Sequence, residues 1–218
     1  MSLFEYLSQI GFWQTLGSQL LLTALTFALA TAVGFPMGVL AFRYHMLTPP
    51  LIGLVNLLQT LPAFALFGIF VVLGRTSSAT SLLLAVLYTI LPVIFGTEKG
   101  FRRIGRPPVD AALGMGMDRR QLFFRVMLPL ASPQVMVGLR KAAVAAVGMV
   151  TLATMRGGGL GVLILDGIQQ GSGRMVVAGA APACLLALAA DLGMALAHRR
   201  LVPAPLRRRQ KRERYIAK

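Results

Sequence analysis

The charged side chains that could bind a partner gather between residues 110 and 129, in the middle of a sequence that is otherwise largely apolar. This segment opens with Asp110 and carries Arg119, Arg120 and Arg125. Carboxylate and guanidinium groups form charge-assisted hydrogen bonds with the surface of a partner. The residue types therefore favour binding chemistry, and we expect the segment to meet something outside the apolar part of the protein.

Catalytic and metal chemistry have no comparable basis in the sequence. His45 and His198 lack a Cys, His or Asp at ligand spacing, and no serine, histidine and acid cluster indicates a nucleophile. No glycine-rich loop is followed by Lys and Ser or Thr, so a Walker-type ATP site is not expected. The single cysteine, Cys184, is interpreted as a small buried hydrophobic residue. We predict no enzymatic activity, no metal site and no cofactor in this chain.

The composition is that of a membrane protein. Of 218 residues, 56% are hydrophobic and 13% are charged, and the mean hydropathy is +0.72, whereas soluble domains carry about 25% charged residues. Because a membrane helix needs about 20 apolar residues, we predict an all-α integral membrane protein with five transmembrane helices. These lie near residues 16–42, 51–73, 79–95, 135–155 and 175–197. The glycine-rich piece at 157–168 is too short to span and is expected to be a loop or re-entrant element.

The basic residues predict the orientation of the chain. Of 22 Lys and Arg residues, 19 fall in the loops and tail on one side of these spans, and only Arg75, Arg156 and Arg174 fall on the other. The positive-inside rule then places the N-terminus outside and the C-terminus in the cytoplasm of a bacterial cell. This explains most of the net charge of +15 without nucleic acid. The tail, residues 201–218, is expected to be disordered, with binding to anionic lipid as the alternative. No basic residue precedes the first apolar run, so no cleaved signal peptide is expected.

The central segment itself is predicted to begin with a short helix. Pro107 and Pro108 suit the first helical turn, and Asp110 is expected in that turn, where an acid complements the helix dipole. Gly114 and Gly116 are expected to end the helix and permit a reversal of the chain.

A second short helix is predicted at residues 119–128. Asp118 is a suitable N-cap, and Gln121 completes a capping box. Pro129 and Pro133 are expected to mark the end of this helix and the approach to the next span. Its apolar side would be formed by Leu122, Phe123 and Val126. Such a helix pair suits docking into a groove of a partner, and a linker lying on the inner leaflet is the alternative.

A few polar residues lie within the second predicted span. Asn56, Gln59 and Thr60 are spaced three and four apart and share one helix face, beside Pro62. Polar groups in membrane helices face the protein interior or a solute pathway. Both interpretations remain open: these residues line a pathway, or they form hydrogen bonds between helices.

The spacing within the central segment resembles the Glu-Ala-Ala loop of ABC importer permeases, the loop that docks on the ATPase subunit. The matching residues are Asp110-Ala111-Ala112, Gly116, Val126 and Leu128-Pro129, with Asp at 110 where the family has Glu and Val at 126 where it has Ile. The resemblance implies that the docking residues include Asp110, Ala111, Ala112, Gly114, Gly116, Asp118, Arg119, Leu122, Phe123, Val126, Leu128 and Pro129.

Further stretches look like permeases for glycine betaine, carnitine, choline and related osmoprotectants, from about residue 15 to 200. They are 58–68, 88–94, 114–122, 138–143 and 157–161. The resemblance implies a type I importer permease: a transmembrane domain at residues 1–200 with its coupling loop at 101–130. It also implies a second permease subunit, identical or different, an ABC ATPase that carries ATP and Mg, and an extracytoplasmic substrate-binding protein. An outer gate would include Arg156, Gly157, Gly158, Gly159 and Asp166, with Arg156 standing where the family often has an uncharged residue.

Three alternatives remain at this stage. The first is an importer of amino acids such as methionine, whose permeases also have five spans. The second is a channel or exporter that works without an ATPase and needs no docking loop. The third, an integral membrane enzyme, is disfavoured because no catalytic set of residues lies at one depth.

Overall fold

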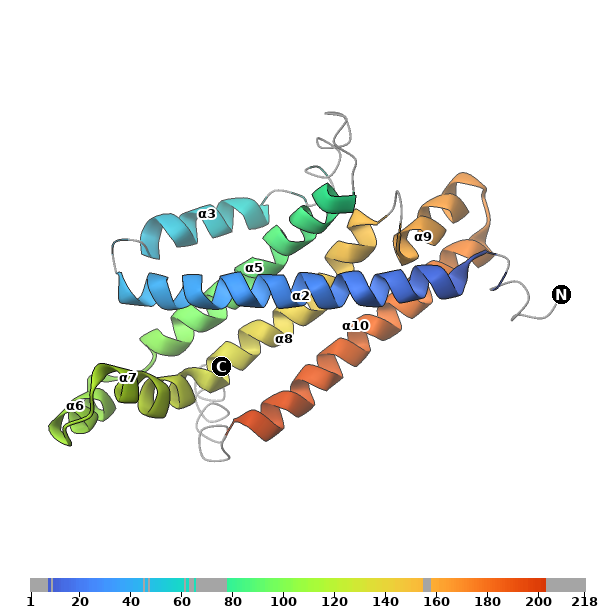
Figure 1. Cartoon of the computed structure of the whole chain (residues 1–218). Coiled ribbons are helices and arrows are strands. Elements are labelled where there is room, and N and C mark those ends of the chain that lie inside the picture. Colours follow the sequence, from blue (N-terminus) through green and yellow to red (C-terminus); the bar gives the residue numbers. More distant parts are fainter. Residues whose placement is uncertain are drawn as a thin grey trace, which may run out of the picture.

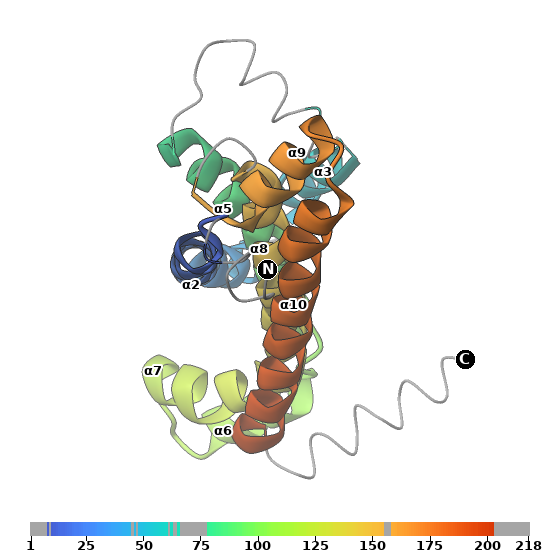
Figure 2. The same ribbon diagram turned by 90° about the vertical axis from the view of Figure 1, so that its right-hand side faces the viewer.

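The computed structural model describes residues 8, 10–44, 46, 48–60, 62, 65, 78–154 and 158–202, and the elements in these ranges are all helical. The long helices lie side by side, with α6 and α7 at one end of the bundle and α9 at the other (Figures 1 and 2). The all-α prediction is confirmed. The elements in chain order are α2 (Phe12–Arg43), α3 (Thr48–Thr60), α5 (Ser78–Arg102), α6 (Arg106–Gly114), α7 (Arg119–Gln121), η2 (Leu122–Met127), α8 (Leu128–Ala153), α9 (Leu160–Gln169) and α10 (Gly173–Leu201).

Four stretches of the described chain have the length and apolar character to cross a membrane, and they match four of the five predicted spans. They are Phe12–Arg43, Leu82–Arg102, Arg119–Ala153 and Gly173–Leu201. Helix α5 runs seven residues past the predicted end at 95. Its last residues are polar and therefore lay outside the apolar stretch on which the prediction was based. The second predicted span, 51–73, remains a prediction: α3 supplies its first part, and most of residues 61–77 lie outside the described ranges.

Helix α5 packs through small residues against α2 on one side and against α8 on the other. On α2, Gly34 and Gly38 face α5, and a Cβ atom added at Gly38 would lie 2.5 Å from Cβ of Thr97. On the other side, a Cβ atom at Gly96 would lie 2.5 Å from Cα of Gly138 on α8. Small residues four apart allow helix backbones to approach closely in membranes. The fold is therefore held by close backbone crossings at α5.

Helix α10 lies on the outside of the bundle. Its apolar side chains are largely exposed in the isolated chain, among them Leu185, Leu188 and Leu192. Cys184 is exposed as well, so the prediction of a buried cysteine is wrong: the apolar run that contains it covers the outer face of the helix. Such a face suits contact with lipid or another subunit.

A bidentate ion pair ties α10 to the bundle. Arg140 of α8 donates through Nε and Nη2 to the two carboxylate oxygens of Asp191, each at 2.5 Å. This pair gives Asp191 a structural role, because it joins α10 to α8.

Candidate functional site

The predicted first helix of the central segment is α6. Pro107 and Pro108 occupy its first turn after Gly105, as predicted. Because the helix begins at Arg106, Asp110 lies beyond the first turn; the prediction that it complements the N-terminal dipole there is wrong. The side chain of Asp110 is exposed, which leaves the carboxylate free for a partner.

Helix α6 ends in a Schellman motif that requires glycine at one position. The amide of Met117 donates to the carbonyl of Ala112 (3.2 Å), and the amide of Gly116 donates to that of Leu113 (2.9 Å). Gly116 has φ of +79°, a region that side chains with Cβ rarely adopt. Gly114 is helical, so the reversal depends on Gly116 alone.

The second helix begins with the predicted capping box. The amide of Gln121 donates to Oδ1 of Asp118 (2.7 Å), and the amide of Asp118 donates to Oε1 of Gln121 (3.4 Å). Its predicted end is wrong, because the helix runs on through Pro129 and Pro133 into α8.

A π-helical segment explains this continuity. Residues 122–127 are wound as a π-helix, and the amide of Leu128 donates to the carbonyl of Phe123, five residues back. A proline in an α-helix collides with the carbonyl four residues before it, which for Pro129 is that of Arg125. The wider turn at 122–127 relieves this collision. The second helix of the central segment therefore runs without a break into the membrane helix α8.

An aromatic stack fastens the same segment to two further helices. Phe101 of α5 is fully buried; its ring centroid lies 5.5 Å from that of Phe42 of α2 and 5.4 Å from that of Phe123, with an interplanar angle of 8° to Phe123. Stacked aromatic pairs add to the stabilisation from buried area. The segment is thus packed against α2, α5 and α8 together.

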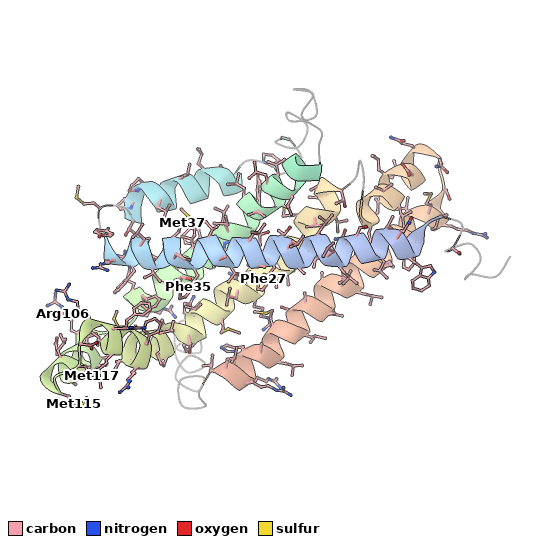
Figure 3. All side chains as sticks on the ribbon, in the orientation of Figure 1. Phe27, Phe35, Met37, Arg106, Met115 and Met117 are labelled. Atoms are coloured by element: carbon pink, nitrogen blue, oxygen red, sulfur yellow. The ribbon has the colours of Figure 1, made fainter. Side chains whose placement is uncertain are left out.

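The outer surface of the segment carries apolar side chains beside charged ones. Leu113, Met115 and Phe124 are 50%, 70% and 56% exposed, and Asp110 and Arg119 are exposed with them. Met115 lies at the end of the segment away from the bundle (Figure 3). Exposed apolar residues rimmed by charges are typical of protein interfaces. We call the exposed side chains of residues 110–125 the docking surface.

The predicted docking residues divide into two groups. Phe123 is turned toward Phe101, while its neighbour Phe124, which was not predicted to dock, takes the exposed position. Ala112, Leu122, Val126, Leu128 and Pro129 are likewise buried or half-buried, whereas the exposed predicted residues are Asp110, Ala111, Gly114, Gly116, Asp118 and Arg119.

The other candidate residues lie apart from this surface. Asn56 and Gln59 belong to α3, but their side chains lie outside the described part of the structure. Thr60 and Pro62 are exposed, and the Thr60 hydroxyl donates to the carbonyl of Leu57 at 2.7 Å. Their role in a pathway stays a prediction.

Helix α9, which carries the outer-gate candidate Asp166, lies at the opposite end of the bundle from the docking surface (Figure 1). Arg156 and Gly157 are outside the described residues. Gly158 has φ of +97°, Gly159 is buried, and Asp166 is half-buried on α9. The piece predicted as a loop or re-entrant element thus contains a ten-residue helix.

Two buried polar groups were not selected from the sequence. Gln19, fully buried on α2, forms hydrogen bonds with α8 and α9. Glu98, buried near the end of α5, accepts from Nε of Arg102 at 2.5 Å, and Nη2 of Arg102 donates to Oγ1 of Thr48 at 3.2 Å. Both could have been found in the sequence as a single amide or acid within an apolar run, since such groups need hydrogen-bond partners in a membrane.

Comparison with known proteins decides the family. The family model "Binding-protein-dependent transport system inner membrane component" matches residues 30–203, a range that contains α5, the docking surface and α9. The chain belongs to this family. The predicted resemblance to importer permeases is confirmed.

Several relatives of this permease are similar over most of its length. The choline transport system permease protein OpuBB of Bacillus subtilis is 31% identical over 91% of this chain and 96% of its own. The osmoprotectant import permease protein OsmW of Salmonella typhimurium is 36% identical over 85% of this chain and 89% of its own. The glycine betaine/carnitine/choline permease protein OpuCD of Bacillus subtilis is 36% identical over 80% and 77%.

A solved structure shares the fold of this permease. A chain of the inward-facing MetNI methionine ABC transporter superposes with a TM-score of 0.74 at 19% identity, covering 93% of this chain and all of that one. This confirms the type I importer permease fold. At this identity the likeness concerns the fold alone.

Proposed function

We propose that this permease is the membrane subunit of an ATP-driven importer for a small osmoprotectant such as glycine betaine, choline or carnitine. The observation that supports the ATP-driven mechanism is the docking surface: the helix that carries its second half continues into α8, and Phe123 beneath it stacks on Phe101 of α5, which in turn packs on Phe42 of α2. The substrate class is supported by three relatives named for choline, glycine betaine, carnitine or osmoprotectant transport. These named solutes share a trimethylammonium group.

The importer works with three kinds of partner in this proposal. An ABC ATPase binds the docking surface and carries ATP and Mg, a second permease subunit completes the pathway, and an extracytoplasmic binding protein delivers the solute. Closure of the ATPase pair draws the docking loops together and moves α2, α5 and α8 with them. The permease takes no part in ATP chemistry and needs no cofactor. A methionine-type importer is the second candidate, favoured only by the shared fold.

Uptake by cells that carry or lack the gene tests the solute. We expect that radiolabelled glycine betaine, choline or carnitine enters cells with the gene at least about tenfold faster at micromolar concentration, because a solute with a fixed charge crosses the apolar bilayer only slowly without a transporter. Labelled methionine is the matched comparison. Gene-dependent entry of methionine, and of none of the three trimethylammonium compounds, would establish the second candidate instead.

The proposed orientation places the docking surface and the C-terminus in the cytoplasm. We expect a green fluorescent protein fused after Lys218 to be fluorescent and alkaline phosphatase at the same position to be inactive, because 19 of the 22 basic residues lie on that side. The same two reporters fused after Gln170, between α9 and α10, should give the opposite pattern. Active phosphatase at the C-terminus contradicts the orientation.

A further inference from the structure

Helix α9 begins without a cap of its own. Its N-cap residue is Gly159, in extended conformation, which has no side chain to accept a hydrogen bond. The first amides of a helix need an external acceptor. The amide of Leu160, a fully buried residue, donates to Oε1 of Gln19 at 3.3 Å. The cap of α9 is therefore supplied by α2, 141 residues earlier in the chain.

The same amide group is bound to α8. Nε2 of Gln19 donates to Oγ1 of Thr151 at 3.0 Å and to the carbonyl of Val147 at 3.3 Å. The Thr151 hydroxyl donates to that carbonyl at 2.8 Å, which leaves its oxygen to accept from Gln19. The reverse orientation of the amide would set its NH₂ group against the Leu160 amide, donor against donor. The network therefore fixes which atom of Gln19 faces α9.

Glycine at 159 allows this contact. A Cβ atom at Gly159 would lie 2.6 Å from Oε1 of Gln19 and 2.5 Å from Oγ1 of Thr154. Since Gly159 has an extended backbone, the reason for glycine is close approach and not a positive φ. Gly159 is thus packed against Gln19 of α2 and against Thr154 at the end of α8.

Helix α9 is in turn packed closely against α10. A Cβ atom at Gly167 would lie 2.7 Å from the amide nitrogen of Val176, and one at Gly179 would lie 2.9 Å from the carbonyl oxygen of Leu160. The two helices form a tight hairpin, so whatever fixes the start of α9 also fixes the outer end of α10.

We propose that Gln19 is a positioning residue of the outer gate: its side-chain amide holds the start of α9 to α2 and α8, so that these elements move as one unit during transport. The proposal rests on the proposed importer function for its second half, the movement, and on geometry alone for its first half, the attachment. Without the amide, α9 would move independently of α8, and ATP hydrolysis would no longer open and close the gate in step.

Hydrogen–deuterium exchange of the purified permease tests the attachment. In Gln19→Leu, we expect the peptide covering residues 158–169 to exchange at least tenfold faster, with α5 unchanged, because the Leu160 amide loses its acceptor. The control is Gln14→Leu, the same substitution at an exposed position of the same helix. Unchanged exchange at 158–169 in Gln19→Leu overturns the proposal.

Solute imported per ATP hydrolysed, in membrane vesicles containing the whole importer, tests the movement. This ratio does not depend on how much protein is present, so a loss of folded protein alone would not move it. We expect it to fall at least threefold in Gln19→Leu and to stay unchanged in Gln14→Leu. Faster exchange with an unchanged ratio overturns the gating role.

Thr151→Val provides a second variant should Gln19→Leu fail to accumulate. It keeps the size of the side chain and removes one of the two acceptors that hold Gln19 to α8, leaving the carbonyl of Val147. The same two measurements apply, with smaller expected changes in the same directions. Absence of any solute uptake by the unsubstituted permease overturns the proposed function, and the exchange experiment then still decides the attachment.

Discussion

Replacing Gly138 with alanine is expected to lower the melting temperature of the purified permease by at least about 5 °C. The new Cβ atom would lie 2.6 Å from the carbonyl oxygen of Pro92 and 2.8 Å from Cα of Gly96. Both contacts are with backbone, so no rotation of a side chain can relieve them, and α5 and α8 must separate. Overpacking of this kind costs about 1–3 kcal/mol, at the upper end where backbone must move.

The matched control is Gly148→Ala, ten residues further along the same helix. A Cβ atom at Gly148 has no atom within 4 Å, and alanine is favoured over glycine inside a helix by about 1 kcal/mol. We therefore expect Gly148→Ala to match or exceed the melting temperature of the unsubstituted permease, as measured by dye-monitored unfolding in detergent. Equal melting temperatures for the two variants would show that the α5–α8 crossing is looser than the structure has it.

The length of the apolar runs predicted four of the helices, because burial in a membrane requires a minimum length and little else. The crossings between these helices were not predicted. Gly34 and Gly38, and Gly96 and Gly100, show the four-residue spacing of close helix contacts. That spacing identifies a face of a helix, but it does not identify the helix that packs on this face. Gly34 and Gly38 of α2 pack on α5, whereas Gly96 and Gly100 of α5 pack on α8.

In the central segment, too, features that depend on neighbouring residues could be predicted, and features that depend on distant residues could not. Its capping box and the reversal at Gly116 were predictable, since each is satisfied within a few residues. The continuation of the helix through Pro129 was not predictable, because a π-helical turn depends on how neighbouring helices hold the segment. The stack of Phe42, Phe101 and Phe123 joins residues 59 and 22 positions apart in sequence, and the sequence pattern does not indicate that pairing.

Replacing Gly116 with valine is expected to reduce solute uptake about tenfold while the amount of permease in the membrane stays the same. Gly116 has φ of +79°, and a residue with Cβ pays about 1–2 kcal/mol in this region, more when it is β-branched. Since about 1.4 kcal/mol corresponds to a factor of ten, the ratio of molecules with the native turn between α6 and α7 to those without it would fall about tenfold. The docking surface includes Met115 at this turn and Phe124 beyond it, so the ATPase should also co-purify less well with a tagged permease.

Gly116→Asn separates backbone strain from the loss of glycine as such. Asparagine is close to valine in size but tolerates a left-handed backbone, and no atom lies within 4 Å of a Cβ at this position to exclude either side chain. We therefore expect Gly116→Asn to keep most of the uptake and of the co-purifying ATPase that Gly116→Val loses. Because neither variant alters a charged or apolar side chain of the docking surface, a difference between them traces transport to the shape of the turn. Full uptake by Gly116→Val would mean that solute crosses the membrane without a correctly folded docking loop, which is the behaviour of a channel and not of an ATP-driven importer.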